Sequence, residues 1–177
     1  MIFKIKNDIR PENAEYYDIL CVEKIEHSHG ISSVSFVIIE ELALSSKVVL
    51  RFDWKEKYQI DPTDFLWIEE TNILFFKSTN QWAAFDLLFK KLVRHESSNW
   101  SPLITRRPNY VLIEDDIMAE AVDLNGRMID SVPIDPPTEA VIFDDRIEYN
   151  SPVFGRQTLK LKTFNSDLNC SQSTERI

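Results

Sequence analysis

Short apolar runs alternate along the chain with polar or proline-containing turns. The runs are of strand length and rich in β-branched and aromatic residues, which is the pattern of β-strands. Most prolines fall between the runs, where a missing backbone donor does not interrupt a hydrogen-bonded ladder. The pattern predicts strands at Ile2–Ile5, Tyr17–Ile25, Ile31–Glu40, Lys47–Trp54, Phe65–Glu69, Ile73–Phe76, Tyr110–Ile113, Met118–Leu124, Met128–Val132, Val141–Phe143, Ile147–Tyr149 and Gln157–Leu161.

The sequence also contains an internal repeat. TNILFFKSTNQWAAFDL, from Thr71, aligns without gaps on PNYVLIEDDIMAEAVDL, from Pro108, at an offset of 37 residues. A partial third copy, VIFDDRIEY and then QTLKL, follows at a shorter spacing. The stretches WAAFDLLFKKLVRHE and AEAVDLNGRMIDSVP resemble the inner-to-outer strands of β-propeller blades, which are repeated meanders of this size. The repeat predicts a mainly β fold of antiparallel, blade-like meanders, arranged as a sandwich or a partial propeller.

One segment fits two structures. Its apolar residues recur at spacings of three and four, as in an amphipathic helix, and Ser78 and Gln81 could form a capping box before them. The repeat instead predicts a hairpin here, so α+β with one helix near residues 81–94 remains the alternative fold. The residues concerned are Trp82, Phe85, Leu88, Phe89 and Leu92. We expect a single domain over residues 1–164 and a flexible tail over 165–177, where apolar residues are few.

Composition excludes several classes of protein. No apolar run approaches the roughly 18 residues of a membrane span, and the first residues do not resemble a secretory signal, so we expect a cytoplasmic protein that does not enter a membrane. The three glycines, Gly30, Gly126 and Gly155, are too scattered for a phosphate-binding or dinucleotide-binding loop. Cys21 and Cys170 show no metal or redox spacing, and Cys21 is expected to be buried. We expect no cofactor.

Candidate chemistry is sparse. Carboxylate pairs recur in three similar settings, at Glu69-Glu70, Asp115-Asp116 and Asp144-Asp145. They could act as general acid and base or bind a hard cation, but acidic residues also suit hairpin turns. We favour the turns, because adjacent strand residues point to opposite faces and do not converge on one substrate. His27 and His29 flank a polar turn without an identifiable third metal ligand, and His95 lacks a recognisable nucleophile. We therefore expect no catalytic residue, no metal site and no enzymatic activity.

Charge is distributed unevenly. Residues 111–148 hold eleven acidic residues against two arginines, a net charge of −9 that equals the formal charge of the whole chain. Residues 77–107 are instead basic, with six cations against Asp86 and Glu96. A one-signed segment of a folded domain attracts an oppositely charged partner and repels nucleic acid. Simple solubility would also account for such a charge.

A small, acidic, non-enzymatic chain is similar in type to the immunity proteins of bacterial polymorphic-toxin and contact-dependent growth inhibition systems. That resemblance, which rests on charge and size, implies an inhibitor that covers the active site of a basic toxin, a nuclease being expected. The partner would be a protein, not nucleic acid or a membrane. A β-meander scaffold that binds a peptide or a subunit is the alternative. The candidate contact residues are Glu69, Glu70, Trp100, Tyr110, Glu114, Asp115, Asp116, Glu120, Asp144 and Asp145.

Overall fold

The computed structural model describes residues 2–12, 15–24, 30–40 and 47–161. The predicted tail at 165–177 and the histidines at 27 and 29 lie outside these residues. The described residues form strands and two short 3-10 turns, η1 (Pro62–Asp64) and η2 (Glu69–Thr71). The strands are β1 (Ile2–Ile9), β2 (Ile19–Val22), β3 (Ser33–Glu40), β4 (Val48–Trp54), β5 (Phe65–Ile68), β6 (Ile73–Lys77), β7 (Gln81–Asp86), β8 (Lys91–Ser97), β9 (Leu103–Arg106), β10 (Tyr110–Glu114), β11 (Met118–Asp123), β12 (Met128–Pro133), β13 (Glu139–Ile142), β14 (Arg146–Ser151) and β15 (Gly155–Lys160).

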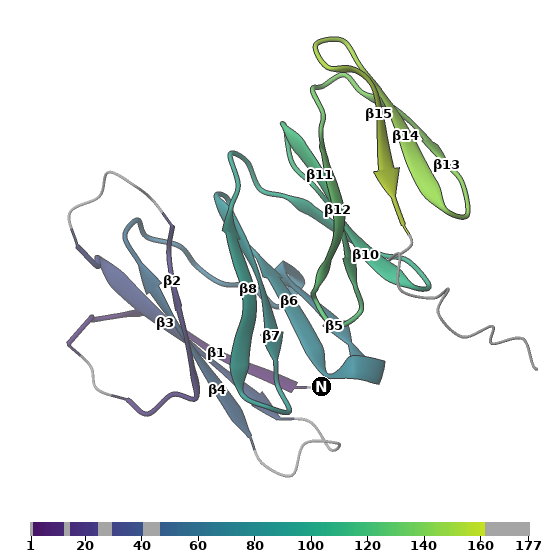
Figure 1. Cartoon of the computed structure of the whole chain (residues 1–177). Helices are drawn as coiled ribbons and strands as arrows, with labels where there is room; N and C mark the ends of the chain where they lie inside the picture. The colour runs from purple at the N-terminus through teal and green to yellow at the C-terminus, as the bar shows by residue number, and fades with distance from the viewer. Residues whose placement is uncertain (1, 13–14, 25–29, 41–46, 162–177) are drawn as a thin grey trace, which may run out of the picture.

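The strands form four sheets that follow one another in a row (Figure 1). Sheet I has the order β1-β3-β4-β2, sheet II β5-β6-β7-β8, sheet III β12-β11-β10-β9 and sheet IV β13-β14-β15. Sheets II to IV are antiparallel meanders, which confirms the predicted mainly β fold of meander repeats. In Figure 1 sheets I and IV lie at opposite ends of the row, so the described residues form an open stack rather than a closed ring.

The ambiguous segment near residues 81–94 is a hairpin, and the helical alternative was wrong. Strand β7 pairs antiparallel with β8, with Trp82 opposite Glu96. Trp82 and Ala84 face sheet III, whereas Phe85 faces sheet I, and all three are buried. A strand buried on both faces shows a continuous apolar run instead of a clean alternation, and such a run also matches helical spacing.

The repeat of sheets II and III is confirmed in three dimensions and is longer than the alignment indicated. The shorter spacing predicted for the third copy is wrong, because VIFDDRIEY begins in the first strand of sheet IV, β13, whereas the segment it was aligned with begins in the second strand of sheet III, β10. The second strands of sheets II, III and IV begin at Ile73, Tyr110 and Arg146, offsets of 37 and 36 residues. Strand β9 was not predicted. It occupies in sheet III the place that β5 holds in sheet II, so extending the repeat backwards by one strand would have located it.

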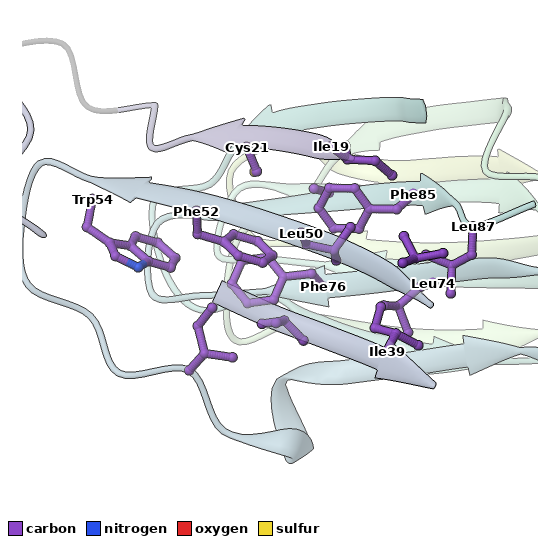
Figure 2. Close-up of a cluster of buried hydrophobic side chains, with 14 residues drawn as sticks. Ile19, Cys21, Ile39, Leu50, Phe52, Trp54, Leu74, Phe76, Phe85 and Leu87 are labelled. Atoms are coloured by element: carbon purple, nitrogen blue, oxygen red, sulfur yellow. The ribbon is translucent and has the colours of Figure 1, made fainter. Parts of the chain in front are cut away.

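Three apolar cores lie between successive sheets. The core between sheets I and II is centred on Phe52, whose ring lies 4.6 Å from that of Phe76 and 5.8 Å from that of Phe85 (Figure 2). Ile73, Phe75 and Val111 belong to the core between sheets II and III, and Leu112, Ile147 and Leu159 to that between III and IV. Each inner sheet therefore buries both faces, which is how stacked repeats stabilise one another.

The two end sheets differ from the inner ones. In sheet I, β2 pairs parallel with β4, so this sheet is not a simple meander. The outward face of sheet IV is polar, because Glu148 pairs with Arg146 at 2.8 Å and also with Arg156. A polar outer face is typical of the terminal unit of a repeat stack, where no further sheet packs against it.

Candidate functional site

The strand pairing places the loops of sheets II to IV at two ends of the stack. Loops 78–80, 98–102, 115–117, 134–138 and 152–154 lie at one end, which we call the Trp100 end. Loops 69–72, 87–90, 107–109, 124–127 and 143–145 lie at the other, the Gly126 end. Hydrogen bonds connect neighbouring loops: the amide of Ile134 donates to the carbonyl of Ile117 at 2.9 Å, and the hydroxyl of Ser98 donates to Asp115 at 2.9 Å.

The predicted contact residues are divided between these ends. Lying in the loops of the Trp100 end, or in the strands beside them, are Trp100, Glu114, Asp115, Asp116 and Glu120. Lying at the Gly126 end are Glu69, Glu70, Tyr110, Asp144 and Asp145. The structure therefore does not gather the predicted set on one surface. Tyr110 is buried and packs in the core between sheets III and IV.

Two carboxylates of the Trp100 end have structural partners. Asp115 accepts hydrogen bonds from the amides of Ile117 and Met118, at 2.9 and 2.8 Å, and so closes its own turn. Glu114 accepts a hydrogen bond of 2.8 Å from the hydroxyl of Tyr149, a buried residue of sheet IV. These hydrogen bonds agree with the interpretation of Asp115 as a turn carboxylate that the sequence favoured.

The Trp100 end also exposes large apolar side chains beside its acids. Trp100 is 65% exposed and Val153 is 69% exposed. The full set is Trp100, Leu103, Ile117, Val153 and Phe154. The five loops of this end carry Asp115, Asp116 and Asp135 but no lysine or arginine. Exposed apolar groups bordered by charge of one sign are typical of protein-contact surfaces.

Charge at the Gly126 end is mixed instead. Glu70 pairs with Arg106, and Asp145 lies 3.0 Å from the Arg146 guanidinium, which also stacks on the ring of Phe143 at 4.1 Å. The pKa of Glu70 is lowered first by a hydrogen bond from its own backbone amide and second by its pair with Arg106. The negative charge of residues 111–148 is therefore partly neutralised at this end and uncompensated in the loops of the other.

Glu120 lies between sheets II and III and faces a cation. Arg94 Nη2 lies 2.8 Å from Glu120 Oε2 and forms an ion pair with it. The Arg94 guanidinium also stacks over the buried Trp82 ring at 5.0 Å. Burial raises the pKa of Glu120, and Arg94 opposes that rise. Glu120 thus joins two sheets.

A partly buried cluster of Cys21, Gln81 and His95 was not foreseen from the sequence, because 74 residues separate the cysteine from the histidine. His95 Nε2 lies 3.8 Å from Cys21 Sγ and 2.9 Å from Gln81 Oε1. Burial lowers the pKa of His95 to about 4 and raises that of Cys21 to about 12. Both groups are neutral near pH 7, and a protonated thiol is a poor nucleophile. Cys21 is buried, as predicted.

Among the described residues, no three histidine, cysteine or acidic side chains are grouped as a metal site would require. No helix in the same part of the chain has the length and apolar content to cross a membrane. Comparison of the sequence with protein-family models and with curated proteins gave no match.

Proposed function

We propose that the chain is a non-enzymatic, cytoplasmic inhibitor of the immunity type, which neutralises a basic toxin by covering its active site with the Trp100 end. One observation supports this proposal above the others. Exposed apolar side chains, among them Trp100 and Ile117, share an end of the stack with carboxylates that no lysine or arginine in the same loops offsets.

The surface has the composition that such a contact requires. Trp100 supplies an aromatic anchor, and interface energy concentrates in buried aromatic and arginine side chains. Asp116 and Asp135 supply negative charge that accelerates encounter with a cationic groove. A nuclease holds phosphates in such a groove, so carboxylates at the same place would exclude its substrate by occupation and by charge.

The test uses the protein encoded immediately upstream of this chain, produced as a purified pair with it. We expect a stoichiometric complex that abolishes the nuclease activity of the upstream protein. The variant W100A/D116N/D135N should bind at least about 30-fold more weakly, since truncating one aromatic hot spot costs about 2 kcal/mol or more. Asp115 and Glu114 stay intact because they hold the fold.

The matched control is E69Q/D144N, which removes two charges from exposed residues of the Gly126 end. It should inhibit like the natural chain. Absence of inhibition by the natural chain would refute the immunity function, and equal losses in both variants would refute the assignment to the Trp100 end.

A scaffold module that binds an apolar peptide or subunit is the second candidate, supported by the exposed Val153 and Phe154 at the same end. The two candidates differ in salt dependence. A contact steered by carboxylates slows in association as salt rises, because the Debye length shortens from about 10 Å at 0.1 M to about 3 Å at 1 M. An apolar contact keeps its association rate over that range.

A further inference from the structure

Arg107, in the loop between β9 and β10, is a partly buried cation that has no counterion among the described residues. Its Nε atom is buried and has no hydrogen-bond partner, and its guanidinium makes no ion pair within the described residues. The preceding Arg106 pairs with Glu70. Burying a charge without a partner is costly, so such groups are normally paired or hydrogen-bonded. A guanidinium left in this state is suited to an anion from outside the chain.

The guanidinium borders a hollow of about 290 Å³ between the Gly126-end loops of sheets III and IV. This volume is near the lower limit of ligand sites, which measure about 300–1,000 Å³. The lining is polar on the side of sheet III and apolar on the side of sheet IV. The polar residues Arg107, Asn109 and Tyr110 come from sheet III, and the apolar residues Ile142, Phe143 and Leu161 come from sheet IV and its last strand.

The charged residues that line the hollow are Arg107 and Asp144, and Arg146 lies beside it, stacked on the ring of Phe143 at 4.1 Å. Asp144 also lines it and is exposed, so it is the lining carboxylate that would repel an anion. Burial raises the pKa of Tyr110, and the charge of Arg107 opposes that rise, so the phenol stays protonated and can donate a hydrogen bond. A ligand would therefore meet the Arg107 cation, one hydroxyl donor and one exposed carboxylate, with a second cation, Arg146, on the Phe143 ring.

We propose that this hollow binds a small carboxylate that carries an apolar group. The carboxylate would pair with Arg107, whose planar donors match its two oxygens, and the apolar group would cover Ile142 and Phe143. The site lies at the opposite end of the stack from the Trp100 end, so it does not depend on the proposed inhibitor function. Its ligand class includes free aromatic acids and the C-terminal phenylalanine of a peptide.

The experiment titrates the full chain with N-acetyl-L-phenylalanine and with its uncharged amide, following backbone amide shifts by NMR. We expect the acid to shift the amides of residues 107–110 and 142–144, with a dissociation constant on the order of 1 mM for a ligand of this size. The amide should bind at least tenfold more weakly. The peptide Ala-Ala-Phe separates the two sources, because it binds as tightly as the acid only if the hollow admits a chain end.

Matched variants test the assignment to one side chain. R107M should lose binding of the acid at least tenfold, and R106M, which removes the same charge one residue away, should retain it. D144N should strengthen binding a few-fold, because the opposing charge is gone. R107M should fold, since an apolar side chain replaces an unpaired buried charge. Equal binding of acid and amide, no binding of either, or equal losses in R106M and R107M would each refute the proposal.

Discussion

Gly126 connects two sheets, and replacing it with alanine is expected to destabilise the stack. Its φ of +77° lies in the left-handed region, which costs a residue with a Cβ about 1–2 kcal/mol. An added Cβ would also lie 3.1 Å from Ala84 Cβ and 3.3 Å from Val93 Cγ1, both in sheet II. Overpacking of this kind costs about 1–3 kcal/mol. The G126A variant should therefore lose about 2–5 kcal/mol of unfolding free energy.

Gly155 provides the matched control. Its φ is +67°, but an added Cβ would meet nothing within 4 Å, so G155A should lose only the backbone contribution of about 1–2 kcal/mol. Urea denaturation followed by tryptophan fluorescence measures both variants, and a fall in midpoint at constant m isolates the change in stability. If G126A is no less stable than G155A, the close packing between sheets II and III at Gly126 is incorrect.

Two further predictions concern buried polar groups. Glu23 is buried and accepts hydrogen bonds from the amides of residues 55 and 56, at 2.6 and 2.9 Å, so E23Q should lower the unfolding free energy measured by urea denaturation by about 2 kcal/mol. The control E69Q, at an exposed residue, should change it by less than about 0.5 kcal/mol. Equal changes in the two variants would contradict a stabilising role of the Glu23 hydrogen bonds. The pKa of His95 is about 4 in the folded chain, against an ordinary value of 6.5, so the unfolded chain binds the proton first and stability falls as the pH drops from about 6.5 to 4. The full pKa shift corresponds to about 3 kcal/mol of unfolding free energy, or about 1–2 kcal/mol after discounting for solvent exposure. In a series of urea midpoints measured against pH, H95Q should remove this part of the loss of stability. An unchanged pH profile would show that His95 is not the titrating group.

Most strands could be predicted from the sequence because residues close together in the chain specify them. Apolar and β-branched runs bounded by turns specify strands over a few residues, and a meander joins neighbours along the chain. The parallel pairing of β2 with β4 was not accessible in this way, since it joins Ile19 to Leu50 across an intervening strand. Strand β9, with the sequence LITR, was missed because it is short and contains two polar residues.

The candidate site shows most clearly what the tertiary structure decided. The sequence by itself determined the repeat, the concentration of acids in residues 111–148 and the presence of turns at the acidic pairs. It did not determine which end of the stack each pair occupies, because in a meander every additional strand reverses the direction of the chain. Asp144 and Asp145 follow the first strand of their sheet, whereas Asp115 and Asp116 follow the second, so the two pairs lie at opposite ends. Residues distant in sequence likewise decide which charges are paired. Arg107 is recognised as a cation without a counterion among the described residues only once the contacts of its neighbours are known.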